Sequence, residues 1–545
     1  MKLSDAGLRD RQAWEGAQVR LPGYDRDAMR AATEAAPVWV HFGAGNIFRG
    51  FIAGLQQRLL EQGLAECGII AADTFDYDIL DRIYAPHDSL TLAVGLHPDG
   101  TTGREVIASI AKGLRADSAD AGQMAQLRAA FASPSLQMVS FTITEKGYAL
   151  TTLSGQLQDV AAADMAAGPA AARHAMSMVA ALMYERYCAG AWPVALVSMD
   201  NCSRNGEKLR GSVLAVVHAW AERGLVPAAF VSYMKDETRV SFLWSMIDKI
   251  TPRPDARIAA ALEADGIEDM APIVTSRNTF IAPFVNAEVP QYLVIEDRFP
   301  NGRPRLEQAG VYLTDRQTVN RAERMKVSTC LNPLHTALAV FGCLLGYDSI
   351  AAEMQDPDLK RLVERIGYDE GLPVATDPGI LSPTAFLHEV IDQRLPNPFI
   401  PDTPQRIATD TSMKVPIRFG ETIKAYAASE SLRVMDLTAI PLAIAAWLRY
   451  LLGVDDAGQP MPVSDDPQLP ALQAELEGIV WSDPASYHGQ LRGVLCQPAL
   501  FGANLCRLGL SEKIERVFVQ MLAGPGAVRA ALKQSCGAEE QEGRA

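Results

Sequence analysis

The chain has few cysteines, and none of them stands in a pattern that binds a metal. Its 545 residues contain eight cysteines, and no two form a C-x-x-C pair or another spacing typical of zinc or iron–sulfur ligands. Because disulfides are rare in the cytosol, we interpret these cysteines as reduced thiols of a cytoplasmic protein. The sequence therefore predicts neither a metal site nor a disulfide framework.

Long apolar runs and an excess of basic residues are also missing. No uninterrupted apolar run reaches the roughly 18 residues of a membrane span, and the N-terminus is polar where a secretory signal would be apolar. The formal net charge of −15 argues against nucleic acid or an anionic membrane as a partner. We expect a protein that acts on a small molecule, as a monomer or a small homo-oligomer.

A strand, a glycine turn and a helix follow a lead-in arm of residues 1–36. Residues 38–42 are apolar, Gly43-Ala44-Gly45 is a tight turn, and residues 46–60 have helical periodicity. Two such glycines let the backbone approach a pyrophosphate at the helix N-terminus, as in dinucleotide-binding folds. The sequence therefore predicts a dinucleotide site at this turn.

The glycine pattern of this turn is incomplete. Phe48 stands where the third glycine is usual, and Gly50 follows two residues later, so the motif alone is a weak signal. Arg49, just inside the helix, could reinforce an anion site.

An acid ends the second predicted strand, residues 67–72. Asp73 there would bind the ribose hydroxyls of NAD and repel the 2′-phosphate of NADP. Asp76 and Asp78 compete for this role, and the alternative is that Asp73 is an ordinary loop acid.

Two further apolar strands, residues 136–144 and 192–199, run into polar tails. Because ligands collect at the carboxyl ends of parallel strands, both tails point to one crevice. Asn201 in the second tail can donate its amide N–H to a developing oxyanion. The alternative is a turn asparagine.

The character of the chain changes after about residue 310. Strands and helices alternate up to about residue 300, which indicates an α/β domain with a mostly parallel sheet. We expect a Rossmann-like NAD-binding domain over residues 37–305 and a mostly helical substrate-binding domain over residues 306–545. Helices are predicted for residues 337–347, 351–368, 382–394, 417–429, 435–452, 468–480 and 513–533, with an irregular, basic substrate loop or helix start over residues 395–416.

Residues 325–347 combine polar side chains with a long apolar run. Asn332 and His335 are three apart and share a helix face, and Asn332 before Pro333 suits an N-cap. Desolvation beside the apolar run lowers the pKa of Lys326 and lets it exchange a proton with an alcohol or ketone oxygen. The alternative is a buried helix with an asparagine cap, a surface lysine and a satisfied core histidine.

In order and spacing these motifs resemble the polyol-specific long-chain dehydrogenases, the mannitol dehydrogenase family, over roughly residues 37–540. The matching motifs are Gly43-x-Gly45 with Arg49, Thr144-Glu145-Lys146-Gly147-Tyr148, Asp200-Asn201 with Asn205-Gly206, residues 245–252, Glu323-x-x-Lys326, Asn332-x-x-His335, Asn397-Pro398, and Arg406-Ile407-Ala408-x-Asp410-x-Ser412-x-Lys414.

The resemblance implies metal-independent hydride transfer between a secondary alcohol and a ketone with NAD(H). Lys326 would be the acid/base, Asn201 and Asn332 would hold the reacting oxygen, His335 would orient the substrate, and Glu323 would relay the proton. The implied cofactor contacts are Gly43, Gly45, Asn46, Ile47, Arg49, Asp73, Thr144 and Glu145; the implied substrate contacts are Arg406, Lys414 and Arg394.

Within the family, residues 326–347 and the long N-terminal arm are most similar to the fructuronate reductase, or mannonate oxidoreductase, branch. The expected substrate pair is therefore D-fructuronate and D-mannonate. The alternatives are a mannitol 2-dehydrogenase or another polyol dehydrogenase, a tagaturonate reductase, and a catalytically silent NAD-binding regulatory protein. A silent protein would be free to lose Lys326, Asn201, Asn332 and His335, and all of them are present.

Two departures from the family pattern stand out. The asparagine lies six residues after Lys326 instead of five, which on a straight helix separates the two side chains by about 240°. They can share a pocket only if the backbone bulges or breaks, and Pro333 makes a kink or bulge there expected. Thr411 also stands where the family has glycine.

Overall fold

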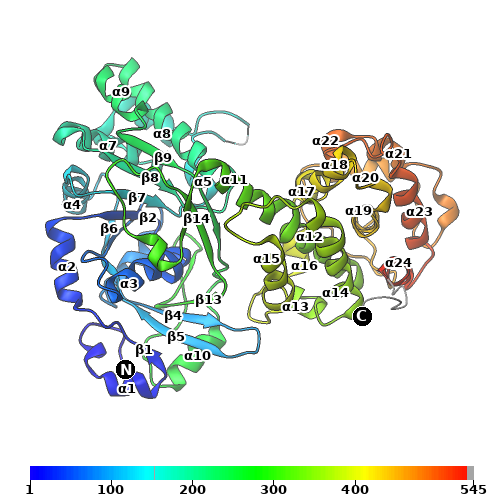
Figure 1. The fold of residues 1–545 in the computed structure, drawn as a ribbon, viewed down its shortest axis with the longest axis horizontal. Coiled ribbons are helices and arrows are strands. Elements are labelled where there is room, and N and C mark those ends of the chain that lie inside the picture. The colour runs from blue at the N-terminus through cyan, green and yellow to red at the C-terminus, as the bar shows by residue number, and fades with distance from the viewer. Residues whose placement is uncertain (153, 537–545) are drawn as a thin grey trace. The chain divides into compact units, whose positions relative to one another are not determined.

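The computed structural model describes residues 1–152 and 154–536 (Figure 1). The chain forms two compact units: unit 1 holds residues 1–97 and 101–320, and unit 2 holds residues 98–100 and 321–545.

Unit 1 is built on a six-stranded sheet in which every neighbouring pair is parallel. Its strands are β2 (Trp39–Phe42), β3 (Ile69–Asp73), β6 (Ile110–Arg115), β7 (Met138–Phe141), β8 (Val194–Ser198) and β9 (Val240–Leu243). Their spatial order, β6-β3-β2-β7-β8-β9, is the Rossmann order, whose topological switch point lies between the first and fourth strands of the sheet, here β2 and β7. The predicted α/β class is confirmed.

Both faces of this sheet are buried, as expected for a parallel sheet. Alternate residues of β2 enter different cores: Val40 and Phe42 pack with helices α4 (Ala121–Ala132), α7 (Ala175–Gly190) and α8 (Asn205–Glu222), whereas Trp39 packs toward α3 (Ala53–Glu61). Figure 1 shows these helices around the sheet.

Unit 1 contains two further sheets of more than two strands, in part where no strand was predicted. One joins β1 (Val19–Arg20), β5 (Thr102–Ile107), β4 (Thr91–Leu96) and β13 (Phe284–Glu288). The other joins β10 (Ser245–Asp248), β14 (Tyr292–Glu296) and β15 (Tyr312–Thr314). The N-terminal lead-in thus adds a strand to the first of these sheets.

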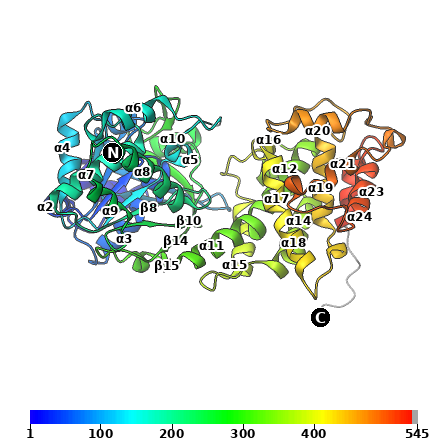
Figure 2. The same ribbon diagram turned by 90° about the horizontal axis from the view of Figure 1, so that it is seen from above.

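Unit 2 is helical and packs around one apolar helix, α12 (Asn332–Leu345). Figure 2 shows α12 among its neighbours. Helices that contact α12 include α14 (Pro357–Glu364), α16 (Pro404–Ala408), α17 (Thr411–Arg418), α19 (Ala439–Tyr450) and α24 (Ala527–Cys536). The burial expected for the uncharged run from Ala337 to Tyr347 is confirmed for residues 337–344, whereas the last three residues are partly or fully exposed.

Several predictions in unit 2 need correction. The predicted helix over residues 351–368 is broken, because α13 (Ile350–Glu353) ends before α14 begins and a π-helical segment follows over Arg365–Gly371. The predicted helix over residues 513–533 is two helices, α23 (Ser511–Met521) and α24, because Gly524 and Gly526 take positive φ between them. The irregular stretch over residues 395–416, predicted as a loop or a helix start, contains α16 and the start of α17, and Pro416 lies inside α17. Thr411 starts α17 and its φ is not positive, so glycine is not required there.

The segment Arg316–Leu345 has the length and mean hydropathy of a membrane span, but 83% of its most apolar window is buried inside the protein. That burial is the property of a core helix.

The prediction that all cysteines are free thiols is wrong. Cys496 and Cys506 form a disulfide with their Cα atoms 5.3 Å apart, while the other six cysteines are free. The ten-residue separation has no sequence signature, because the turn after α21 (Leu491–Leu495) sets the distance.

Candidate functional site

The glycine turn after β2 has the geometry that a dinucleotide requires. Gly43 has a φ of 104°, and a Cβ there would lie 2.2 Å from the carbonyl oxygen of Thr142, so only glycine fits. A Cβ at Gly45 would meet no atom within 4 Å, which leaves open space beside the turn. The first-turn N–H groups of the helix, at Asn46 and Ile47, have no intrahelical acceptor and suit an anion such as a pyrophosphate.

Gly50 takes over the packing role of the missing third glycine. A Cβ at Gly50 would lie 2.7 Å from Cγ1 of Val285 in β13, so the helix approaches a strand closely there. Phe48, in the third glycine's position, is buried and stacks on His41 with ring centroids 4.1 Å apart. The turn therefore fits a dinucleotide despite its incomplete pattern.

Asp73 lies at the glycine turn, whereas its two competitors are bound elsewhere. The Asp73 carboxylate accepts hydrogen bonds from the backbone N–H of Ala44 at 3.0 Å and Phe75 at 2.8 Å. Burial raises the pKa of this carboxyl, and its backbone hydrogen bonds offset that only in part. Asp76 accepts from Thr275 at 2.6 Å, and Asp78 accepts from the backbone of residue 276 at 2.9 Å.

Arg49 is placed differently from the prediction. It is fully buried and donates to the carbonyl of Ala282 and to the side chain of Asn46, both at 2.8 Å. Burial lowers its pKa to about 10. An inaccessible guanidinium does not touch an anion, so Arg49 positions Asn46 in place of the predicted direct contact.

The polar tails of β7 and β8 meet, as predicted. Asp200 at the end of β8 accepts hydrogen bonds from the backbone N–H of Ile143 at 2.9 Å and Thr144 at 2.8 Å, and from the hydroxyl of Tyr148 at 2.5 Å. Burial raises the pKa of Asp200, and these hydrogen bonds offset that in part. Sequence reasoning assigned no role to Asp200, although an acid directly after a strand was the available signal.

Several predicted residues of these tails are exposed. Thr144 has a φ of 65°, which its bond to Asp200 stabilises, and its neighbour Glu145 forms an ion pair with Lys208. Asn201 is exposed at the carboxyl edge of the sheet, where ligands of this fold bind.

In unit 2 the backbone bulges directly after α11 (Arg316–Met325), as the six-residue spacing predicts. A π-helical turn spans Lys326–Cys330, and the N–H of Leu331 donates to the carbonyl of Lys326 at 3.1 Å. A π turn holds one more residue than an α-helical turn, so it absorbs the extra residue. The Lys326 side chain is buried, with 2% of its surface exposed.

Asn332 is the first residue of α12 and not its cap. Leu331 holds the cap position without a side-chain hydrogen bond. The Asn332 side chain is half-buried and forms no hydrogen bond with any described residue. Its amide is therefore available to a ligand.

His335, one turn along α12, contacts an acid that also forms an ion pair with an arginine. Its Nε2 is 3.2 Å from Oδ2 of Asp402, whose other oxygen accepts from Arg406. Burial would raise the pKa of Asp402, but the hydrogen bond and charge of His335 and the charge of Arg406 lower it below its usual range. The imidazole is thus fixed by its carboxylate partner.

The remaining predicted residues of unit 2 lie on other helices: Glu323 on α11, Lys414 on α17 and Arg394 at the end of a π-helical segment, Val390–Arg394. Glu323, three residues before Lys326, is half-buried and has no ion-pair partner among the described residues. Lys414 donates to the carbonyl of Ile407 at 2.9 Å; burial, then the charge of Arg418, lowers its pKa to about 8. Arg394 is buried, with its guanidinium 5.9 Å from the centroid of the Phe386 ring.

Sequence reasoning missed Arg418, whose Nη1 donates to Oγ1 of Thr336 at 2.7 Å. The signal was its i, i+4 spacing from Lys414, which places both on one helix face.

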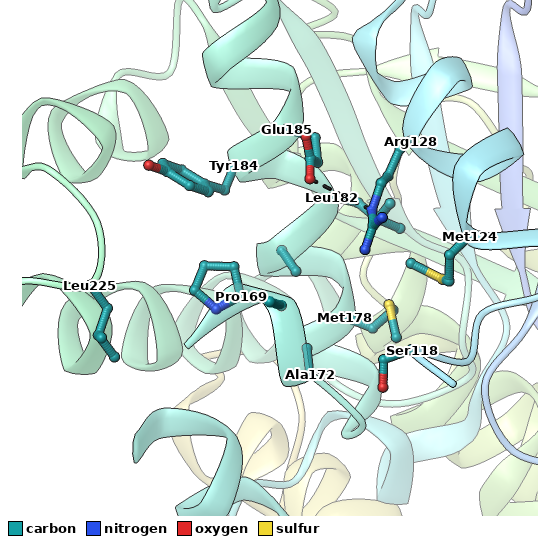
Figure 3. A pocket seen from close by; sticks show the side chains of 12 residues that line it. Ser118, Met124, Arg128, Pro169, Ala172, Met178, Leu182, Tyr184, Glu185 and Leu225 are labelled. Atoms are coloured by element: carbon teal, nitrogen blue, oxygen red, sulfur yellow. Dashed lines mark ion pairs between the residues drawn. The ribbon is translucent and has the colours of Figure 1, made fainter. Parts of the chain in front are cut away.

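A pocket of about 380 Å³ lies elsewhere in unit 1, between α4 and α7 (Figure 3). None of the predicted site residues lines it, and its charged side chains, Arg128 and Glu185, pair with each other at 3.6 Å. Within the described part of the chain, no group of three or more His, Cys, Asp or Glu side chains could hold a metal ion.

Comparison with known proteins identifies the family. The Mannitol dehydrogenase Rossmann domain model matches residues 38–308, and the Mannitol dehydrogenase C-terminal domain model matches residues 318–483. D-mannonate oxidoreductase of Thermotoga maritima is 52% identical over 99% of this chain and 100% of that protein. Polyol:NADP oxidoreductase of Gluconobacter oxydans is 29% identical over 81% of this chain and 84% of that protein.

A solved structure shares the whole fold. The ternary complex of Pseudomonas fluorescens mannitol 2-dehydrogenase with NAD and D-mannitol superimposes with a TM-score of 0.69, at 26% identity, over 98% of this chain and 99% of that chain. Together with the dinucleotide turn of unit 1 and the polar start of α12 in unit 2, these matches show that the chain belongs to the mannitol dehydrogenase family of oxidoreductases, which act on secondary alcohols.

Proposed function

We propose that this protein interconverts D-mannonate and D-fructuronate with NAD(H). The substrate assignment rests on the 52% identity, over essentially the full length of both chains, to a protein named D-mannonate oxidoreductase. The cofactor proposal rests on the glycine turn and on Asp73 beside it, and the neighbouring structure contains NAD.

In the proposed reaction, NAD accepts a hydride from the alcohol carbon and returns it in the reverse direction. Lys326 takes the hydroxyl proton as the hydride leaves and returns it to the ketone oxygen on reduction. Asn332 and Asn201 donate amide N–H groups to the reacting oxygen. Glu323, one helical turn from Lys326, relays the proton to solvent, and His335, fixed by Asp402, orients the substrate.

The same proposal covers the remaining features of the protein. Arg406, Lys414 and Arg394 bind the far end of the substrate, no metal takes part, and the protein works in the cytoplasm as a monomer or a small homo-oligomer. The net charge of −15 supports partners other than nucleic acid and anionic membranes.

A substrate panel tests the function. Initial rates of NADH oxidation with D-fructuronate, D-tagaturonate and D-fructose should give the highest kcat/KM for D-fructuronate. A higher kcat/KM for D-fructose would favour a mannitol 2-dehydrogenase, and a higher value for D-tagaturonate would favour a tagaturonate reductase. No oxidation of NADH with any of the three would support the catalytically silent alternative.

A further inference from the structure

Three cationic side chains gather near the start of α12, and they differ in what neutralises them. Arg406 forms an ion pair with Asp402. Lys414 is held by the backbone carbonyls of Ile407 and Thr409. Arg418 forms no ion pair with any described residue. Arg418 is therefore the cation of this cluster without a partner acid.

The guanidinium of Arg418 is fixed on one side and open on the other. Its Nη1 donates to Oγ1 of Thr336 at 2.7 Å and to the carbonyl of Asn332 at 3.5 Å. Its Nε and Nη2 donate to no described residue, and the side chain is only partly buried. These two nitrogens form the edge of an arginine that binds a carboxylate through two parallel hydrogen bonds.

A partly buried cation without a partner acid destabilises the protein unless a bound anion neutralises its charge. Burial lowers the pKa of Arg418 to about 10, the direction expected when solvent stabilises the charged form less well. Charges removed from water are tolerated when a partner of opposite sign is supplied. The open edge of Arg418 can receive that partner from an anionic ligand.

We propose that Arg418 binds the carboxylate of the sugar-acid substrate and sets the preference of the enzyme for sugar acids over neutral polyols. The inference rests on the proposed function. The other two cations already have partners within the protein. Arg406 forms an ion pair with Asp402, and Lys414 donates hydrogen bonds to backbone carbonyls. The hydrogen bonds of Arg418 to the backbone carbonyl of Asn332 and the hydroxyl of Thr336 fix its guanidinium against α12, so its open edge is held in place before the carboxylate binds.

Binding of two matched ligands tests this role. D-mannonate and its neutral isostere D-mannonamide differ in the carboxylate alone, and their Kd values can be measured by calorimetry on the same protein with NADH bound. We expect wild type to prefer D-mannonate by about 10- to 100-fold, the range of a charge-assisted hydrogen bond. Arg418→Gln should bind both about equally, and Arg418→Lys should be intermediate because it keeps the charge and loses the paired donors.

The control is Arg433→Gln, which removes an exposed arginine paired with Asp436 and should keep the wild-type preference. The ratio of two Kd values on one protein does not depend on the fraction of the sample that is folded. Full preference for D-mannonate in Arg418→Gln would overturn the inference while the proposed function stands. A wild-type enzyme that does not prefer D-mannonate would overturn both.

Discussion

At the scale of single residues, the site depends on which polar groups are already paired and which are open. Asp402 holds His335 and Arg406, so these side chains are fixed before substrate arrives. The amide of Asn332 and one edge of Arg418 have no protein partner among the described residues. Preorganised groups with open donors are what stabilisation of a developing oxyanion or a carboxylate requires.

Asp73 should set the choice between NAD and NADP. Asp73→Asn keeps an oxygen for the N–H of Ala44 and removes the charge that repels a 2′-phosphate. A repulsion of about 1–4 kcal/mol between charges 4 Å apart predicts that the ratio of kcat/KM for NAD to that for NADP falls about 10-fold or more. Asp76→Asn is the matched control, because Asp76 is bonded to Thr275. An unchanged ratio in Asp73→Asn, or a clear NADP preference of wild type, would refute this role.

At the scale of secondary-structure elements, the π turn is what makes the unusual spacing workable. On a straight α-helix, Lys326 and Asn332 would lie about 240° apart. The i to i+5 bond between Leu331 and Lys326 inserts one residue without a matching advance of the helix. The π turn thus brings Lys326 and Asn332 closer to the relative position that the five-residue spacing of the family gives them. Helix α17 packs against both the π turn and α12.

A buried acid on the neighbour of α12 predicts a pH dependence of stability. Glu353 in α13 (Ile350–Glu353) is fully buried, and neither carboxyl oxygen has a hydrogen-bond partner among the described residues. Burial, with a smaller contribution from the charge of Asp356, raises its pKa well above the usual range. The folded state therefore keeps the proton on Glu353 to a higher pH than the unfolded state does. The contribution of Glu353 to the free energy of unfolding is fully present below the pKa of glutamate in the unfolded chain, about 4.3, and declines as pH rises above it.

Glu353→Gln mimics the protonated acid and should remove this decline. Compared with wild type, the midpoint of thermal unfolding should be similar near pH 4.5 and higher near pH 8, by an amount that corresponds to about 1 kcal/mol or more. Thermal melts from pH 4.5 to 8 measure it, with the exposed Glu477→Gln as the control. A difference between Glu353→Gln and wild type that stays constant with pH would show that Glu353 does not titrate as proposed.

The sequence predicted those elements whose pattern lies within a short stretch of the chain. The strands beside the glycine turn are short apolar runs, and the bulge after Lys326 followed from counting residues to Asn332. It missed β5, because half of its side chains are polar and its partners, such as β1, lie far away in the chain. It left a loop and a helix start open where α17 begins, because Pro416 and the polar residues before it are typical of loops. Contacts made by tertiary packing, such as that between Arg418 and Thr336, have no local signal.

At the scale of the whole molecule, the residues proposed for the cofactor and those proposed for proton transfer belong to different units. The dinucleotide turn and Asp73 belong to unit 1, whereas Lys326, Asn332 and His335 belong to unit 2. Convergence of Asn201 with the residues of unit 2 stays a prediction.

The whole enzyme should work without a metal. His335 is paired with Asp402 and the reacting oxygen is assigned to a lysine and two asparagines, so no step requires a Lewis acid. Dialysis against EDTA, followed by metal analysis and a rate measurement with D-fructuronate and NADH, should leave kcat unchanged. Loss of activity that one divalent ion restores would refute this prediction.

The central claim is that Lys326 transfers the proton, and Lys326→Ala tests it most directly. Its kcat for reduction of D-fructuronate should fall by a factor on the order of 10²–10⁴ or more, while the Kd for NADH, measured by fluorescence titration, stays at the wild-type value. Added small amines should restore part of the rate, and the partly exposed Lys360→Ala should behave as wild type. A Lys326→Ala enzyme with nearly normal kcat would contradict the account.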